Sequence, residues 1–420
     1  MMEYGLIGEK LGHSFSKVIH NKIADYDYQL KELSPSQLDA FMKEKSFFGI
    51  NVTIPYKKDV IQYLSKIDKE AEKIGAVNTV VNRNSSLYGY NTDIVGIKML
   101  IKKILLGSNR CDLSGLDVLV LGTGGTSLTA SVAAESLGAS SVKRISRSGK
   151  DGALTYKEAE EQCKNAGFII NCTPCGMFPD DGESPISLDK FPRLIGVLDA
   201  IYNPIRTKLI RQALELGIPA EGGLYMLVAQ AVAAYQIFTD ISIDISEASE
   251  KIFKEILLEK ENIVLVGMPS SGKTTVGKEI AKRLKHTFID TDEEIVKEEC
   301  RAITEIFSQD GEKVFREIES RVILKLSSGI NGAVIATGGG AVLNPENVDR
   351  LRANGRIFWL DRPLEALMPT SDRPTASTPE AIKKRYYERL PIYKSRSDFR
   401  IDGDCTVNEA AERILKIIEQ

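Results

Sequence analysis

The stretches DVLVLGTGGTS, residues 117–127, and NIVLVGMPSSGKT, residues 262–274, decide the fold of this chain. In each stretch an apolar run ends in a glycine-rich turn, and a helix-forming sequence follows. Such a strand-to-helix turn presents backbone N–H groups and the positive end of a helix to a phosphate group. The sequence therefore predicts one phosphate-binding turn in each half of the chain.

The second turn is the more specific of the two. Gly267–Thr274 matches the complete P-loop pattern, in which the lysine reaches the β- and γ-phosphates and the threonine binds magnesium. The first turn lacks a lysine–threonine pair, and it suits a dinucleotide instead. We therefore expect a redox cofactor in the first half and ATP with Mg2+ in the second. The candidate cofactor-binding residues are Gly122, Gly124, Gly125 and Thr126 in the first turn, and Gly267, Ser270, Ser271, Gly272, Lys273, Thr274 and Thr275 in the second.

The end of the strand predicted over residues 141–145 distinguishes NADP from NAD. In dinucleotide-binding folds an acidic residue at this place holds the ribose 2′-hydroxyl of NAD. Here the strand ends in Ser146, Arg147 and Ser148, and Lys150 follows closely. A cation suits a 2′-phosphate, so we expect NADP(H), although Arg147 could also be an ordinary solvated surface charge.

Composition is that of an ordinary globular protein. The 420 residues predict about three domains, and 43% of them are hydrophobic and 27% charged. A net charge of −3 does not favour a nucleic-acid or membrane surface. The N-terminus has no basic leader with an apolar core, and no apolar run approaches the roughly 18 residues of a spanning helix, so we expect a cytoplasmic protein. The six cysteines suggest no disulfide framework, and Cys172 and Cys175, although spaced like a redox pair, follow a strand-like run.

Short β-branched runs alternate with helical segments along the whole chain, which predicts an α/β fold with a parallel sheet in each nucleotide-binding domain. We expect strands at 4–8, 28–33, 49–54, 77–82, 86–90, 117–121, 141–145, 167–171 and 195–200, helices at 17–24, 35–45, 57–64, 93–106, 224–238 and 247–259, and a new series from residue 262 to a final helix at 408–419. The helices at 224–238 and 247–259 should pack back onto the first unit. The expected domains are an α/β substrate-binding domain (1–106 with 224–258), a Rossmann-like domain (107–223) and a P-loop domain (262–420).

Seven segments of the first half resemble the shikimate dehydrogenase family, in the family's order, between residue 3 and about residue 255. They are HSFSKVIHN (13–21), NVTIPYK (51–57), GAVNT (75–79), YNTDIVG (90–96), NCTPCGM (171–177), DAIYNP (199–204) and GGLYMLVAQ (222–230). Lys17 departs from the pattern, because the family usually has proline after the second serine. The resemblance implies reduction of 3-dehydroshikimate to shikimate with NADPH.

The resemblance also implies residue roles. Lys57 and Asp93 would flank the carbonyl that is reduced, because hydride arriving there leaves an alkoxide that needs a positioned cation or proton donor. A surface lysine and a helix N-cap are the structural alternatives for these two residues. The remaining candidates are Ser14 and Ser16 for the substrate carboxylate, Thr53, Asn78, Gln230 and Tyr202 for the rest of the substrate, and Thr173, Met177 and Gly223 for the cofactor.

Four segments of the second half resemble shikimate kinase across residues 262–420. They are FIDTD (288–292), GEKVFREIE (311–319), TGGG (337–340) and RLPIY (389–393). The resemblance implies that Arg316 and Arg389 bind the shikimate carboxylate, for which the planar guanidinium fork is suited. It further implies that Asp292 orients or deprotonates the reacting hydroxyl and that Asp290 supports magnesium through water. Gly338, Gly339 and Gly340 would lie against the ring, with Lys273 and Arg373 at the transferring phosphate.

The segment around Arg373 departs from the kinase pattern. The family usually has leucines after the proline, where this chain has Thr375–Thr378, and it usually has an arginine over the adenine near residues 367–369. We therefore expect weaker ATP binding than is usual, with only apolar contact from Met368.

Shikimate is the product implied for the first half and the acceptor implied for the second, which predicts a bifunctional enzyme with small-molecule substrates. Two alternatives remain open at this point. The first half could be a quinate-type dehydrogenase that uses NAD, and the second half could be weakly active or regulatory. The oligomeric state is also left open.

Overall fold

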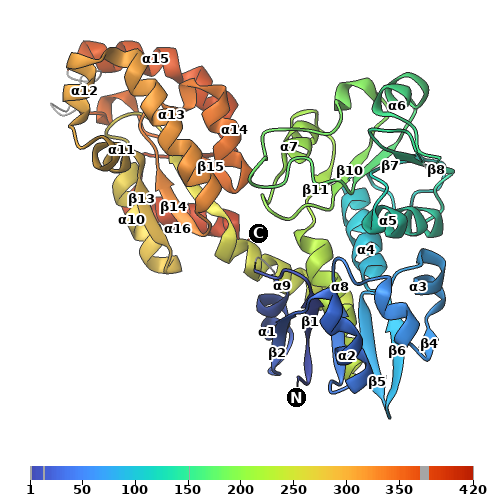
Figure 1. The fold of residues 1–420 in the computed structure, drawn as a ribbon. Coiled ribbons are helices and arrows are strands. Elements are labelled where there is room, and N and C mark those ends of the chain that lie inside the picture. The colour runs from blue at the N-terminus through green and yellow to red at the C-terminus, as the bar shows by residue number, and fades with distance from the viewer. Residues whose placement is uncertain (1, 13–14, 151, 369–377, 420) are drawn as a thin grey trace. The chain divides into compact units, whose positions relative to one another are not determined.

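The computed structural model describes residues 2–12, 15–150, 152–368 and 378–419. The chain forms two compact units, Met1–Glu255 and Ile256–Gln420. Three sheets with flanking helices confirm the predicted α/β class (Figure 1). Within the described residues, no helix combines the length and the apolar character needed to cross a membrane.

The first sheet is mixed. Its strands, in spatial order, are β2 (Tyr28–Glu32), β1 (Tyr4–Gly8), β3 (Gly49–Val52), β5 (Thr79–Arg83), β6 (Ser86–Tyr90) and β4 (Lys66–Ile67). Strand β1 pairs parallel with β2 and β3, whereas β3, β5 and β6 pair antiparallel. Helices α2 (Pro35–Glu44) and α3 (Lys69–Ile74) bury their apolar side chains on one face, and α1 (Ser16–Ile23) and α8 (Leu224–Thr239) cover the other.

The second sheet is entirely parallel. Its strands, in spatial order, are β11 (Ala220–Glu221), β10 (Gly196–Asp199), β9 (Phe168–Asn171), β7 (Asp117–Leu121) and β8 (Ser141–Ile145). The helices that flank it are α4 (Asp93–Leu106) and α5 (Gly125–Ser136) on one face, and α6 (Tyr156–Gln162) and α7 (Lys208–Glu215) on the other. Because all the strands run the same way, the turns after β7, β9 and β10 lie along one edge of the sheet.

Helices α8 and α9 return to the first unit, as predicted from the sequence. Helix α8 packs against α1 and α4. In α9 (Ile245–Lys260), the ring of Phe253 contacts Tyr225, and Glu250 forms an ion pair of 2.7 Å with Lys103. Apolar and charged side chains of α9 therefore both hold its first half on this unit.

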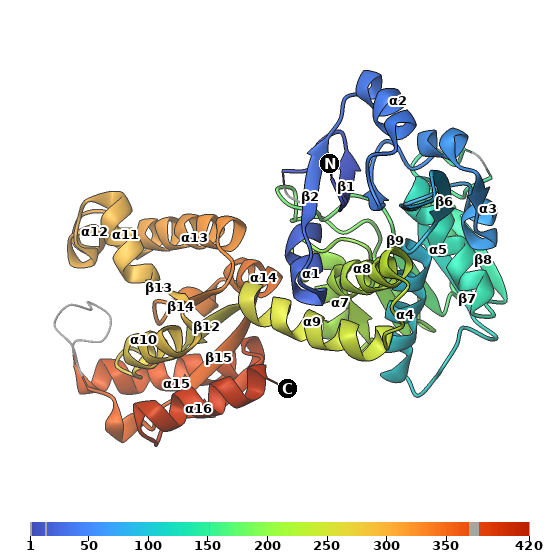
Figure 2. The same cartoon turned by 90° about the horizontal axis from the view of Figure 1, so that it is seen from below.

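The third sheet lies in the second unit, between two layers of helices (Figure 2). Its strands are all parallel and are ordered β13 (Thr287–Asp290), β14 (Ala333–Ala336), β12 (Asn262–Val266), β15 (Gly355–Asp361) and β16 (Phe399–Asp402). The flanking helices are α10 (Lys273–Leu284) and α16 (Val407–Ile418) on one face, and α13 (Gly311–Gly329), α14 (Pro345–Ala353) and α15 (Pro379–Arg396) on the other. Helices α11 (Thr291–Glu299) and α12 (Ile303–Gln309) pack on α13.

The segment 57–64, predicted to be helical, forms a 3-10 helix and not an α-helix. It contains a single 3-10 turn, η1 (Asp59–Tyr63), after which Leu64 is extended. The reason is tertiary, because the chain must extend here to enter β4, which pairs with β6. Helix α3 was not predicted at all, since its six residues are mostly charged; Asp68 caps its start and Gly75, at φ +71°, ends it.

Candidate active sites

Lys57 and Asp93 meet in the first unit. Lys57 lies in the turn after β3, and Asp93 is the first residue of α4. Their Nζ and Oδ2 atoms are 2.6 Å apart, and the two side chains are 24% and 13% exposed. An ion pair that is partly removed from water interacts more strongly than an exposed pair. This arrangement provides a cation in a fixed position that still has access to a small ligand.

Asn78 connects this ion pair to the buried interior. Its amide nitrogen donates to Asp93 Oδ1 at 2.9 Å and to the Thr92 hydroxyl at 3.1 Å, and its oxygen accepts from the Thr92 amide at 2.7 Å. The Thr92 hydroxyl lies 3.4 Å from Gln230 Oε1 on α8. The structure thus brings together the predicted residues Lys57, Asn78, Asp93 and Gln230 from four separate segments.

The other predicted substrate residues of this unit lie on neighbouring segments. Ser16 is buried at the start of α1, and Thr53 directly follows β3. Tyr202 follows β10, and its ring packs edge-on against Phe15, with 5.4 Å between centroids. Tyr202 therefore lies next to Phe15, the residue that precedes Ser16, although the two are far apart in the sequence. Ser14 lies outside the described residues.

The first glycine turn has the shape of a pyrophosphate site. Gly122 has φ +110°, and a side chain at Gly124 or Gly125 would meet no atom within 4 Å, so open space lies in front of the start of α5. The residues therefore fit a dinucleotide. The other predicted cofactor residues lie on nearby segments. After β8, Arg147 and Ser148 are exposed, and the Ser146 hydroxyl accepts a hydrogen bond from the Gly149 amide. After β9, Met177 is exposed and the Thr173 hydroxyl donates a hydrogen bond to the Asn171 side chain. Gly223 precedes α8, where a side chain would collide with the Ala200 backbone.

Asp199 is a buried residue at this sheet edge whose contacts were not anticipated from the sequence. Its Oδ1 atom accepts from the Asn171 side chain and the Ile201 amide, both at 3.0 Å, and its Oδ2 atom accepts from the Thr207 hydroxyl at 2.6 Å. The carboxylate therefore links the turn after β9 to the turn after β10. Burial raises its pKa to about 6, despite these hydrogen bonds.

We expect Asp199→Asn to remove a pH dependence of stability from the first unit. The folded pKa of about 6 exceeds the ordinary value of 3.8. The favourable contribution of Asp199 is therefore complete below about pH 4 and is lost as the pH rises through the folded pKa. Between about pH 4 and 7 the wild type should lose about 3 kcal/mol relative to the variant. Pulse proteolysis in urea, with the fragments of the first unit quantified, measures this difference; a difference that does not change with pH would contradict it.

Cys172 and Cys175 do not have the properties of a redox pair. Both thiols are free. Burial raises the pKa of each, which disfavours the reactive thiolate. Cys172 and Cys175 are therefore better interpreted as structural residues than as a redox pair.

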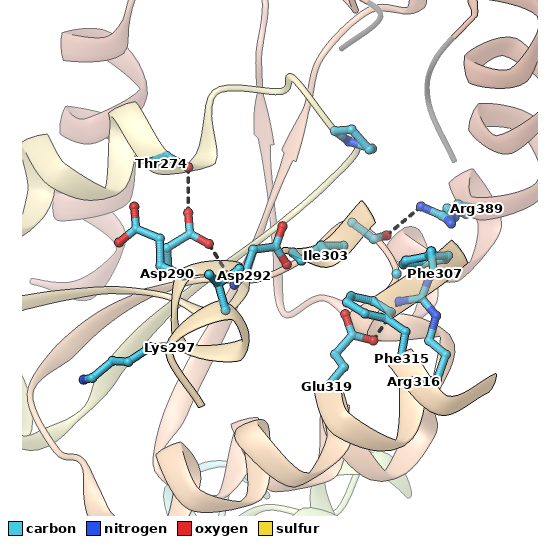
Figure 3. Close-up of a pocket in the computed structure, with 16 residues that line it drawn as sticks. Thr274, Asp290, Asp292, Lys297, Ile303, Phe307, Phe315, Arg316, Glu319 and Arg389 are labelled. Atoms are coloured by element: carbon cyan, nitrogen blue, oxygen red, sulfur yellow. Dashed lines mark hydrogen bonds and ion pairs between the residues drawn. The ribbon is translucent and has the colours of Figure 1, made fainter. Parts of the chain in front are cut away.

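The second glycine turn lies at one end of a cavity of about 540 Å3 in the second unit. Lys273 Nζ donates to the carbonyl oxygens of Gly267 and Met268 at 3.0 and 2.8 Å. The Thr274 hydroxyl donates to Asp290 Oδ2 at 2.9 Å, and Asp290 Oδ1 accepts from the Asp292 amide at 3.0 Å (Figure 3). Magnesium prefers oxygen ligands, so Thr274 and Asp290 fit the predicted metal position.

The cavity brings together the described residues that were predicted to bind the substrate. Its wall includes Asp292, Arg316, Gly338, Gly339, Gly340 and Arg389. A side chain at Gly338 would lie 2.7 Å from Asp292 Oδ1, and one at Gly340 would overlap the Arg316 guanidinium, so a side chain at either position would have to displace a charged group of the site. Arg389 is 3% exposed and donates to the Gly339 carbonyl at 3.0 Å. Arg316, Arg389 and Asp292 therefore line the same cavity.

Glu319 is a member of this site that sequence reasoning did not assign. It lies on α13 one turn after Arg316, pairs with it at 2.7 Å, and is only 1% exposed. Burial raises its pKa. Its Oε1 atom has no hydrogen-bond partner among the described residues. The i,i+3 spacing between Arg316 and Glu319 could have predicted this ion pair from the sequence. No sequence pattern indicated the apolar part of the cavity wall, which consists of Val296, Ile303, Phe307 and Phe315.

The predicted contacts to the adenine and to the transferring phosphate stay predictions. Arg373 lies outside the described residues. Met368 is exposed, and its carbonyl oxygen accepts from the Ser270 hydroxyl at 2.9 Å.

Comparison with known proteins gives matches in both units. Residues 6–80 match the family model for the shikimate dehydrogenase substrate binding domain, and residues 269–419 match that for shikimate kinase. Shikimate dehydrogenase (NADP(+)) of Clostridium perfringens strain SM101 is 34% identical over 274 residues, which are 61% of this chain and 98% of that protein.

Solved structures give the same result for the first unit. Shikimate dehydrogenase 1 from Peptoclostridium difficile has a TM-score of 0.54 and 34% identity, covering 61% of this chain and 98% of that one. A chorismate mutase/shikimate 5-dehydrogenase fusion protein from Clostridium acetobutylicum has a TM-score of 0.55 and 36% identity, covering 61% of this chain and 97% of that one.

Proposed function

Since the chain belongs to the shikimate dehydrogenase family and carries a shikimate kinase domain, we propose that one polypeptide makes shikimate and then phosphorylates it. The first reaction reduces 3-dehydroshikimate with NADPH, and the second transfers a phosphoryl group from MgATP to the 3-hydroxyl of shikimate. Both serve aromatic amino-acid synthesis. The observation that carries the proposal is that each unit holds a charged site suited to one of these reactions.

In the first reaction, NADPH supplies the hydride to the carbonyl carbon. Negative charge then develops on the carbonyl oxygen, and Lys57 Nζ donates a proton to it. Asp93 keeps Lys57 in place through the 2.6 Å ion pair, and Asn78 holds Asp93 from its other oxygen. The hydroxyls of Ser14 and Ser16 bind the substrate carboxylate, and Thr53, Tyr202 and Gln230 contact the rest of the molecule.

In the second reaction, ATP supplies the phosphoryl group, with Thr274 and Asp290 holding its magnesium. Arg316 and Arg389 bind the carboxylate of shikimate, which places the ring against Gly338–Gly340. Asp292 then accepts or orients the proton of the 3-hydroxyl. Lys273 and Arg373 neutralise charge on the phosphate that is transferred.

The decisive experiment is a coupled assay of the full chain with 3-dehydroshikimate, NADPH and ATP, in which every product is quantified. We expect shikimate 3-phosphate to form, and omission of ATP to make shikimate accumulate. Accumulation of shikimate in the presence of ATP would contradict the kinase function and support the regulatory alternative. Replacing the substrates by quinate and NAD tests the other alternative.

Arg147 provides a separate test of the cofactor. Because it is the cation at the tip of β8, we expect Arg147→Ala to raise the KM for NADPH about tenfold, by loss of a charge-assisted contact with the 2′-phosphate. The KM for NADH should stay the same. Lys157→Ala, an exposed lysine on α6, is the control. Equal changes for both cofactors in Arg147→Ala would refute the assignment.

The proposed domain division follows the sheets. The first sheet with α8 and the start of α9 would bind the substrate, which corresponds to residues 1–106 with 224–258. The second sheet would bind NADP through residues 107–223, and residues 262–420 would form the kinase. The first sheet is mixed and the second is entirely parallel, and this difference supports two separate domains within the first unit.

A further inference from the structure

The carbonyl oxygen of Gly339 accepts two hydrogen bonds from one helix. Arg389 and Tyr393 are four residues apart on α15, so their side chains leave the same face. Arg389 Nη1 donates to this oxygen at 3.0 Å, and the Tyr393 hydroxyl donates to it at 2.5 Å. A carbonyl oxygen has two lone pairs, and these two donors use both.

Tyr393 is itself firmly held. The side chain is buried, and its ring stacks on Trp359 of β15, with 5.9 Å between centroids and 15° between planes. Burial raises the pKa of its hydroxyl to about 12. The phenol therefore keeps its proton, and remains a hydrogen-bond donor, at neutral pH.

The shared carbonyl matters because it determines the orientation of Arg389. One guanidinium nitrogen is anchored on Gly339, whereas Nη2 is buried and has no hydrogen-bond partner among the described residues. Arg389 lines the cavity, as Figure 3 shows, with its anchored nitrogen directed at the glycine backbone. A carbonyl held by a single donor could tilt, and the guanidinium would tilt with it.

We propose that Tyr393 is a positioning residue for shikimate: by fixing the Gly339 carbonyl, it holds Arg389 with its unpaired edge toward the substrate carboxylate. This inference rests on the kinase reaction proposed above. Tyr393 touches no reacting atom, and it acts through Arg389. It therefore affects shikimate binding and leaves the phosphoryl transfer itself and the ATP site unchanged.

The first test is Tyr393→Phe, which keeps the ring stack and removes only the hydroxyl. We expect the KM for shikimate to rise about fivefold to tenfold, the effect of one hydrogen bond in a charged network. The kcat and the KM for ATP should stay within about twofold, because no atom near them changes. Tyr387→Phe, on the same helix but 60% exposed, is the matched control.

The second test repeats this substitution in an Arg389→Lys background. Lysine keeps the charge but cannot bridge the carbonyl and a carboxylate with a rigid fork. If Tyr393 acts through Arg389, the added Tyr393→Phe should raise the KM for shikimate less than about twofold. Trp359 is the single tryptophan of the chain, so its emission reports whether the stack survives in every variant.

Three outcomes would overturn the positioning role. The KM for shikimate could be unchanged in Tyr393→Phe, or Tyr393→Phe could raise this KM by the same factor in the wild type and in Arg389→Lys. The third outcome is that Tyr393→Phe unfolds the protein and exposes the tryptophan. The last would make the hydroxyl a stabilising group instead. Failure of the wild type to phosphorylate shikimate would be a different result, because it would remove the proposed kinase function before any variant was compared.

Discussion

Replacing Lys57 with alanine is expected to lower the kcat for reduction of 3-dehydroshikimate by about 10²-fold to 10⁴-fold, the contribution of one positioned proton donor. The reason is that no second cation contacts Asp93 in the ion pairs of the described residues, so none replaces Lys57 at the carbonyl oxygen. Oxidation of NADPH followed by absorbance measures the effect. The Kd for NADPH should not change, because Lys57 is not part of the first glycine turn.

The chain offers two internal controls for this prediction. Lys58→Ala removes an exposed neighbouring lysine and should leave the reaction unchanged. Phosphorylation of shikimate, which belongs to the other unit, should be normal in Lys57→Ala, and the unchanged Kd for NADPH shows that the first unit is folded. Asp93→Ala should lose reduction too, since it frees the lysine to move. Near-normal turnover in both Lys57→Ala and Asp93→Ala would refute the assignment.

The local part of this fold was predictable from the sequence because its causes are local. A P-loop needs glycine, lysine and threonine at fixed spacing, and β12 and α10 lie on either side of it as expected. Helix α4 begins at Asp93 and ends at Leu106, as predicted from its apolar pattern. Segment 57–64 is helical only over Asp59–Tyr63, because the pairing of β4 with β6, and not the local sequence, determines where the chain extends.

The parts of the sites that were missed depend on contacts between distant segments. Asp199 is polar, yet it is buried with three hydrogen-bond donors, one from the end of β9 and two from the segment between β10 and α7. Tyr393 meets Gly339 across 54 residues of chain. No sequence periodicity predicts these hydrogen-bonded pairs. They form only when the fold brings the ends of neighbouring parallel strands to the same edge of a sheet. The family resemblance supplied the residues that are proposed to contact the substrate, but it did not indicate Asp199 or Tyr393, which lie behind them.

Asp292→Asn is expected to lower the kcat for phosphorylation of shikimate by about 10²-fold to 10⁴-fold, because an amide can no longer accept the proton of the 3-hydroxyl. The variant should fold, since Asp292 lies at the start of α11 and its backbone amide keeps the hydrogen bond to Asp290. The KM for shikimate should change little, because the carboxylate is proposed to bind Arg316 and Arg389 instead. Phosphorylation is measured by ADP release, with shikimate supplied directly.

Glu294→Gln is the matched control for this variant, because it changes the same chemical group on the same helix outside the cavity lining. It should phosphorylate shikimate at the rate of the wild type. Reduction of 3-dehydroshikimate should be normal in both variants, so the full coupled reaction of Asp292→Asn should stop at shikimate. If Asp292→Asn instead kept wild-type kcat while Glu319→Gln lost it, the buried Glu319, with its unpaired oxygen near Gly338, would be the acid–base group of this site.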